Sequence, residues 1–150
     1  MTDILEFTLD KFRFEVPTDR FYNEEGLWAL PEGDSRVRIG LSDFLQQRSG
    51  DVAFAEIKPE GTALAFGDEV AVIETIKVDI VLSSPVTGAV VEVNPAMDLS
   101  PEVINQAPYG EGWLVVIEAG DWEADRGRLL DPAAYFEIMK QEAEEEAKKL

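Results

Sequence analysis

The chain has 150 residues, of which 31 are acidic and 13 are basic, so its formal net charge at pH 7 is −18. It contains no cysteine and no histidine, which excludes disulfide bonds, thiolate nucleophiles, zinc sites built from these residues and catalytic triads that need histidine. The negative charge argues against nucleic acid or an anionic membrane surface as a partner.

The composition otherwise indicates a folded protein. Apolar residues make up 45% of the chain, and a chain of this length can bury about two-thirds of its unfolded surface without cross-links. The apolar runs are too short to span a bilayer, and the first residues do not begin a signal peptide. We therefore expect a soluble, cytoplasmic, monomeric protein that makes no membrane contact.

Short strands are predicted from the N-terminus onward. Apolar residues alternate over 5–9 and, with the opposite parity, over 12–16, which predicts a hairpin that turns at Asp10-Lys11. The next predicted strands cover 22–30 and 37–41, separated by the turn at 31–34.

The middle of the chain is predicted to be mostly β. Ser42 is a suitable N-cap for a short helix that ends at Gly50. A strand over 51–57 follows, and residues 62–93 have strand patterns interrupted by turns at Gly67-Asp68 and at 84–88. Such short strands with regular turns are typical of a small sandwich or flattened barrel.

The last third combines helical turns with one strand. Ser100-Pro101-Glu102 predicts the start of a helical turn, and 113–119 is the last predicted strand. Asp131-Pro132 predicts the start of a C-terminal helix. Glutamate dominates beyond Gln141, so we expect a solvated, frayed helical tail over 142–150.

The segment 70–82 carries the candidate chemistry. With Ile76-Lys77 as a two-residue turn, apolar residues on the two strands match in register, and the predicted pairs are Thr75 with Val78, Ile73 with Ile80, Val72 with Val81 and Ala71 with Leu82. Such turns prefer glycine or asparagine, because φ is positive there. Glu74 and Asp79 also face each other, which costs stability unless Lys77 lies between them. A local violation of this kind indicates a functional site, although Lys77 could equally be a solubilising turn residue.

Motifs spread over 21–139 resemble the lipoyl/biotinyl carrier fold and, within it, the glycine cleavage H-protein family. The resemblance divides the chain into an N-terminal hairpin-like extension (1–20), an H-protein-like lipoyl domain (21–141) and an acidic helical tail (142–150). The motifs that carry it are Arg38-Ile39-Gly40-Leu41-Ser42-Asp43, Gly50-Asp51-Val52, Gly67-Asp68, Glu74-Thr75-Ile76-Lys77, Ser84-Pro85-Val86-Thr87-Gly88, Glu92-Val93-Asn94, Ser100-Pro101-Glu102-Val103-Ile104-Asn105 and Pro108-Tyr109-Gly110-Glu111-Gly112-Trp113-Leu114.

The resemblance implies a fold and a site. The implied fold is a mainly β, lipoyl-type barrel-sandwich hybrid with short helices and a C-terminal helix. Lys77 matches the lysine that is amide-linked to lipoic acid, and Glu74 matches a glutamate implied in recognition by lipoylating enzymes. Biotin carriers usually place methionine on both sides of the lysine, whereas Ile76 and Val78 flank Lys77, so the resemblance favours lipoate. The chain would then be a carrier without catalytic residues of its own.

The resemblance also implies a pathway. The carrier would shuttle an aminomethyl group on a lipoyl-lysine arm between glycine decarboxylase, aminomethyltransferase and dihydrolipoyl dehydrogenase, after modification by a lipoate ligase or lipoyl transferase. Gly26-Leu27-Trp28 stands where the family typically has His-Glu-Trp, and Val78 stands where a small residue is usual. Two alternatives therefore stay open: a lipoate-binding protein of another pathway, such as heterodisulfide-reductase-like sulfur oxidation, and an unmodified interaction module with the same fold.

Three other groups of residues are conceivable sites. We expect the large aromatic residues to pack in the core rather than bind a ligand, and Glu111 to be a solvated loop acid. The C-terminal glutamates are predicted to form a solvated helix face rather than a cation site, so no metal site is expected. The residues concerned are Trp28, Tyr109, Trp113, Trp122, Glu142, Glu144, Glu145 and Glu146.

Overall fold

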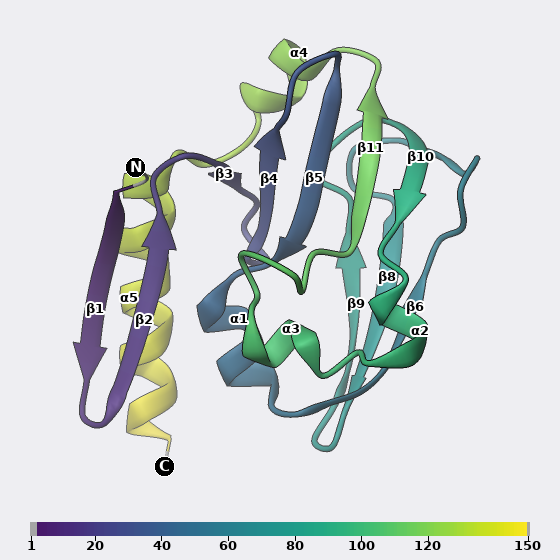
Figure 1. Cartoon of the computed structure of the whole chain (residues 1–150). Helices are drawn as coiled ribbons and strands as arrows, with labels where there is room; N and C mark the ends of the chain where they lie inside the picture. The colour runs from purple at the N-terminus through teal and green to yellow at the C-terminus, as the bar shows by residue number, and fades with distance from the viewer. Residues whose placement is uncertain (1–2, 150) are drawn as a thin grey trace.

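The computed structural model describes residues 3–149 and is mainly β (Figure 1). Its strands are β1 (Ile4–Leu9), β2 (Phe12–Pro17), β3 (Phe21–Tyr22), β4 (Leu27–Pro31), β5 (Arg36–Leu41), β6 (Val52–Ile57), β7 (Ala63–Leu64), β8 (Glu69–Thr75), β9 (Asp79–Ser83), β10 (Gly88–Val93) and β11 (Val115–Ala119). They form a six-stranded sheet in the order β3-β4-β5-β11-β10-β7, a three-stranded sheet in the order β6-β8-β9, and the separate hairpin β1-β2. The predicted fold class is confirmed.

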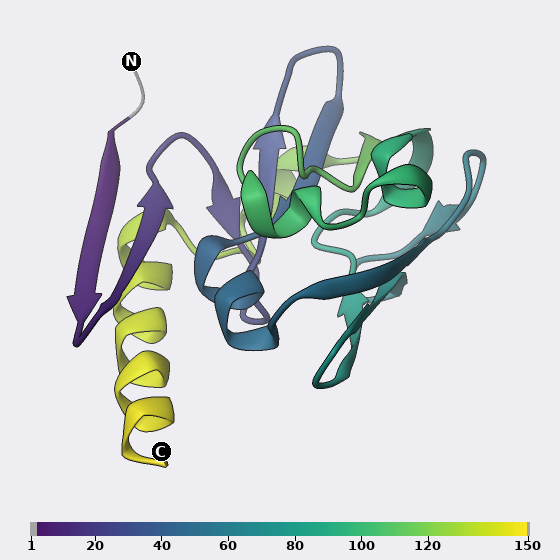
Figure 2. The same ribbon diagram turned by 60° about the horizontal axis from the view of Figure 1, so that its bottom comes forward.

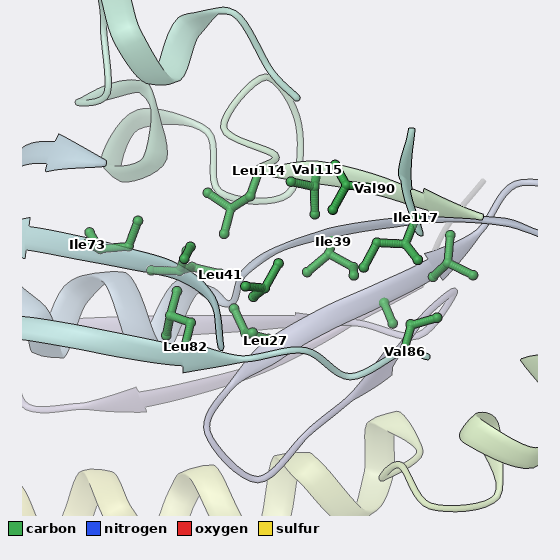
Figure 3. Packing of buried hydrophobic residues seen from close by; sticks show 14 of the residues in the cluster. Leu27, Ile39, Leu41, Ile73, Leu82, Val86, Val90, Leu114, Val115 and Ile117 are labelled. Atoms are coloured by element: carbon green, nitrogen blue, oxygen red, sulfur yellow. The ribbon is translucent and has the colours of Figure 1, made fainter. Parts of the chain in front are cut away.

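The main core lies between the six-stranded and the three-stranded sheet (Figure 3). Leu27, Ile39 and Ile117 from the larger sheet are fully buried with Ile73 and Leu82 from β8 and β9. Full burial of an aliphatic side chain contributes about 1.5–3 kcal/mol relative to leaving it exposed. The sheet that carries the candidate site is thus packed against the larger sheet through this core.

A second, aromatic cluster joins the N-terminal hairpin to the C-terminal helix α5 (Pro132–Lys148). The hairpin and the helix lie side by side in both views (Figures 1 and 2). Phe14 and Val16 from β2 are buried with Tyr22, Tyr135 and Met139, and the rings of Tyr22 and Tyr135 stack with centroids 4.5 Å apart. The predicted N-terminal hairpin is confirmed over its described residues.

The single strand predicted over 22–30 is wrong. The structure has two strands, β3 and β4, joined by a tight turn in which the Asn23 side-chain oxygen accepts hydrogen bonds from the backbone N–H groups of Gly26 (3.0 Å) and Leu27 (2.9 Å). Gly26 has φ +99°, a conformation that glycine adopts without strain. Hydrophobic residues continue on both sides of this turn, which conceals it in the sequence.

The two capped helices begin where they were predicted. In α1 (Asp43–Ser49), the Ser42 hydroxyl accepts a hydrogen bond from Leu45 N–H, and Gly50 forms the C-cap. In α5, the Asp131 carboxylate accepts from Ala134 N–H at 2.8 Å. These boundaries depend on side chains next to the helix, so local sequence predicts them.

The shorter helices agree less well. The turn predicted to start at Ser100 appears as α3 (Val103–Gln106), because Ser100 instead forms the C-cap of α2 (Ala96–Leu99). Neither α2 nor α4 (Trp122–Arg126) was predicted. Both are single helical turns in which no long apolar period can develop.

The acidic segment after Gln141 is not a frayed, solvated tail. Helix α5 continues to Lys148, and Ala143 is only 4% exposed in the aromatic cluster. Arg48 forms ion pairs with Glu142 at 3.2 Å and with Glu146 at 3.8 Å. This part of the helix therefore packs against the rest of the molecule. Residues 1 and 2 of the predicted extension and residue 150 of the predicted tail lie outside the described residues. None of the helices within 3–149 has both the length and the apolar character to cross a bilayer.

Candidate functional site

The candidate site is the tip of the β8–β9 hairpin. The observed register pairs Ile73 with Ile80, Val72 with Val81 and Ala71 with Leu82, and Thr75 N–H donates to Val78 O at 2.8 Å. The predicted register is confirmed, which leaves Ile76 and Lys77 as the two loop residues. Ile76 is 75% exposed at this tip.

The tip does not need the positive φ angles that the sequence rule predicted. Within 3–149, the non-glycine residues with positive φ are Asp10, Asp34 and Ser35, all remote in sequence from the tip. Instead, the Thr75 hydroxyl closes the turn: it accepts from the N–H groups of Lys77 (3.2 Å) and Val78 (3.0 Å) and lies 2.8 Å from Val78 O, to which it donates. The threonine side chain thus stabilises the turn here, whereas asparagine-glycine sequences stabilise it in other hairpins.

The acidic pair beside the tip is present, but Lys77 does not lie between its members. Glu74 and Asp79 are opposite each other and both exposed. Among the ion pairs within 3–149, none joins Lys77 to either carboxylate, and the Lys77 Nζ instead donates to the backbone oxygen of Arg48 at 3.1 Å. The condition under which the facing pair would cost no stability is therefore not met by Lys77. Both carboxylates are solvated, which weakens their mutual repulsion.

The end of helix α1 receives the Lys77 side chain. Arg48 O is one of the last carbonyl groups of that helix, which attract a cation or a hydrogen-bond donor. Gly50 follows with φ +92°, and a Cβ added to it would lie 3.2 Å from Lys77 Cδ. Gly50 was predicted only as a helix stop. Its second role, leaving room for the lysine stem, arises from a contact that sequence spacing does not reveal.

Two hollows flank Lys77, and Arg48 and Glu146 line both of them. The first, the acidic groove, has a volume of about 620 Å³ and includes the carboxylates of Glu24, Glu25, Asp79 and Glu146 in its lining. The second, the hairpin pocket, has about 250 Å³ and is lined mainly by apolar and aromatic side chains. The lysine therefore stands between an acidic and an apolar surface.

The large aromatic residues pack in the core, as predicted. Trp28 is fully buried, Trp113 and Tyr109 pack against the aromatic cluster, and Trp122 packs against the main core. Burial raises the pKa of the Tyr109 hydroxyl well above its ordinary value. The hydroxyl donates to Glu15 O at 2.6 Å and accepts from a backbone N–H at 2.9 Å, so its role is structural.

The remaining acidic candidates lie apart from Lys77 or contact arginine. Glu111 is exposed in its loop, as predicted. Among the C-terminal glutamates, Glu142 and Glu146 contact Arg48, and Glu144 and Glu145 are exposed. Within the described residues, no group of three or more acidic side chains is arranged to hold a metal ion.

An exposed lysine at the tip of a rigid hairpin, on a sandwich of two sheets, is the arrangement of a carrier domain whose cofactor is attached covalently. The family model described as glycine cleavage H-protein matches residues 20–142. The chain belongs to the glycine cleavage H-protein family, which confirms the resemblance of its motifs.

Individual relatives agree with this assignment. The chain is 42% identical over 129 residues to a glycine cleavage system H protein from Thermus thermophilus, covering 86% of this chain and 99% of the relative. It is 41% identical over 127 residues to one from Mycolicibacterium smegmatis, covering 83% and 97%. The crystal structure of a glycine cleavage system H protein from Mycobacterium marinum superposes with a TM-score of 0.72 at 30% identity, covering 80% of this chain and 95% of that one.

Proposed function

We propose that this chain is the lipoyl carrier protein of a glycine cleavage system and that lipoic acid is joined by an amide bond to Nζ of Lys77. The observation that carries the proposal is the position of Lys77, exposed at the hairpin tip with Nζ at the protein surface. Membership of the H-protein family supports the carrier role.

The surroundings of Lys77 fit an acylated lysine. Acylation removes the positive charge of the ammonium group but keeps one N–H, which can still donate to Arg48 O, now 3.1 Å from Nζ. The base of the arm would thus remain at the end of α1. The two hollows beside the lysine offer space on either side for the chain that follows the amide.

Glu74 is the proposed recognition residue for the lipoylating enzyme. It is exposed on β8, three residues before Lys77, and faces Asp79 across the hairpin. The two carboxylates give the side of the hairpin a negative charge next to the reactive amine. A lipoate ligase or lipoyl transferase can use this charge to orient the lysine.

The chain itself supplies attachment, orientation and docking. A bound lipoyl group supplies the redox-active sulfur pair, and this chain has no cysteine or histidine that could replace it. The proposed partners are glycine decarboxylase, aminomethyltransferase and dihydrolipoyl dehydrogenase, which a carrier with a net charge of −18 can approach through basic surfaces around their active sites. We propose that it works as a monomer in the cytoplasm.

The test is intact-mass measurement after incubation with lipoate, ATP and a lipoate ligase. We expect one lipoyl adduct on the wild type, none on Lys77→Arg, and slower modification of Glu74→Gln at unchanged stability. Lys58→Arg is the matched control, because Lys58 lies in an ion pair with Glu69 away from the tip. A wild type that stays unmodified while a known carrier is lipoylated would show that the chain is an unmodified interaction module.

The pathway needs a separate assay. Lipoylated protein should support glycine–bicarbonate exchange by glycine decarboxylase, and Lys77→Arg should not. A lipoylated wild type that fails in this exchange would contradict the glycine cleavage assignment and favour a carrier of another lipoate-dependent pathway.

A further inference from the structure

The hairpin pocket is built partly from segments of the chain that the family match does not cover. Leu9, Phe12 and Phe14 come from the N-terminal hairpin, and Ala143 and Ala147 from the end of α5, whereas the family model spans 20–142. The Thermus relative is aligned over 99% of its own length but only 86% of this chain. The part of the wall that comes from the N-terminal hairpin therefore lies outside the residues that the family model matches.

The N-terminal hairpin and the end of α5 form a structural unit that ends beside Lys77. The turn of the β1–β2 hairpin and the C-terminal half of α5 lie on one side of α1, and the β8–β9 tip lies on the other (Figures 1 and 2). Lys77 itself is among the residues that line the pocket. A group attached to Nζ therefore begins at the pocket wall and needs no movement of the backbone to reach it.

The pocket suits an uncharged acyl chain. Phe12 and Phe14 stack in its wall with centroids 6.4 Å apart, and Phe14 is edge-on to Phe44 at 5.3 Å. The apolar part of its lining is Leu9, Phe12, Phe14, Phe44, Ala143 and Ala147, and the polar part is Asp10, Gln47, Arg48, Lys77 and Glu146. Its volume of about 250 Å³ lies just below the range of roughly 300–1,000 Å³ typical for drug-sized ligands. A protonated amine is better accommodated in the acidic groove, which has four carboxylates in its lining (Glu24, Glu25, Asp79 and Glu146) against two in the hairpin pocket (Asp10 and Glu146).

The Arg48 side chain lines both hollows and is held by helix α5. The Arg48 guanidinium pairs with Glu142 and Glu146, and Glu146 lies beyond the family match. Its carbon also lies 5.9 Å from the centre of the Phe44 ring. Arg48 therefore has a fixed position where the acidic groove and the hairpin pocket meet, while its backbone oxygen accepts from Lys77 Nζ.

From these observations we propose that the hairpin pocket is a resting site for the uncharged lipoyl chain on Lys77, which shelters its sulfur atoms from solvent between encounters with partner enzymes. The proposal rests on the proposed lipoylation of Lys77. Phe12, 43% exposed at the pocket wall, supplies the apolar surface that the chain covers.

The test measures how fast a maleimide alkylates the reduced dithiol of the lipoylated, full-length protein, followed by intact mass. We expect the wild type to react more slowly than free dihydrolipoamide. Phe12→Ser should react faster than wild type by about four- to fifteen-fold, the equivalent of losing the burial of one or two methylene groups. Phe12→Leu should stay close to wild type.

Ile4→Ser is the matched control. Ile4 is 46% exposed on the same hairpin, but it pairs with Pro17 at the end opposite the turn, so its replacement should leave the alkylation rate unchanged. A wild-type rate equal to that of free dihydrolipoamide, or equal acceleration by Ile4→Ser and Phe12→Ser, would overturn the resting site. Absence of the lipoyl adduct before alkylation would overturn the proposed function as well, because there would be no chain to shelter.

Discussion

The Thr75 hydroxyl closes the turn that presents Lys77, and replacing it by a methyl group tests that role. Thr75→Val keeps the β-branched shape and removes one donated and two accepted hydrogen bonds, those with Val78 O, Lys77 N–H and Val78 N–H. An intramolecular hydrogen bond contributes about 0.5–1.5 kcal/mol net. Water can replace part of this at an exposed tip, so we expect a total loss of about 1–2 kcal/mol, confined to the tip.

Amide hydrogen exchange measures this loss where it occurs. A loss of 1–2 kcal/mol should speed exchange of the Lys77 and Val78 amides by about 5–30-fold. The amide of Ile73, which lies in the buried part of β8, should keep its protection. Lipoylation of Lys77 should slow in parallel, since the enzyme would meet a less ordered turn.

Thr62→Val is the control for removing a threonine hydroxyl. The Thr62 hydroxyl donates to Pro59 O at 2.7 Å in another turn, so this variant should leave exchange at Lys77 and Val78 unchanged. Wild-type exchange at both amides in Thr75→Val would refute the reasoning, because it would mean that the strands alone hold the turn.

Two further predictions concern the scaffold. Burial raises the pKa of Glu142 more than Arg48 lowers it, so its ionised form is less favourable in the folded than in the unfolded state, and the stability linked to its protonated form is lost as pH rises. Glu142→Gln should therefore gain stability relative to wild type as the pH rises from about 4 to 7, measured as the difference between their free energies of unfolding in urea. Glu144→Gln removes the same charge at an exposed site, and an equal gain in that variant would contradict this explanation. In Gly88→Ala, the new Cβ would lie 2.0 Å from the backbone oxygen of Glu118, so β10 and β11 must separate. The free energy of unfolding should fall by about 3 kcal/mol or more, which is measured as a lower melting temperature. Gly120→Ala, whose Cβ would come no closer than 4.0 Å to Thr87 O, should change it little, and equal melting temperatures for the two variants would show that the sheet adjusts freely.

The N-terminal hairpin shows how far local patterns reach. The change of parity between 5–9 and 12–16 predicted the hairpin, and the structure pairs Leu9 with Phe12 around the turn. Alternation could not indicate what covers its apolar face. That face packs on α5, more than a hundred residues later in the chain, which also explains why Ala143 is buried in a segment whose composition indicated a solvated tail.

The turn at Asn23 is the opposite case, in which a local signal was present but hidden. Asparagine followed three residues later by glycine suits a tight turn, and Asn23 Oδ1 does accept from Gly26 N–H. The hydrophobic residues on either side continue the strand pattern, so periodicity alone merged β3 and β4. A pattern based on side-chain burial cannot distinguish one strand from two that share the same core.

The sequence by itself determined the mainly β fold, the register of the β8–β9 hairpin, the place of Lys77 at its tip and the caps of α1 and α5. Each of these depends on residues a few positions apart, whose spacing decides which backbone groups and side chains meet. Only the tertiary structure decided that Lys77 Nζ binds Arg48 O, that Arg48 pairs with α5, and that an apolar pocket opens beside the lysine. Those contacts join segments from four parts of the chain, and packing of both cores must bring them together before any of them exists.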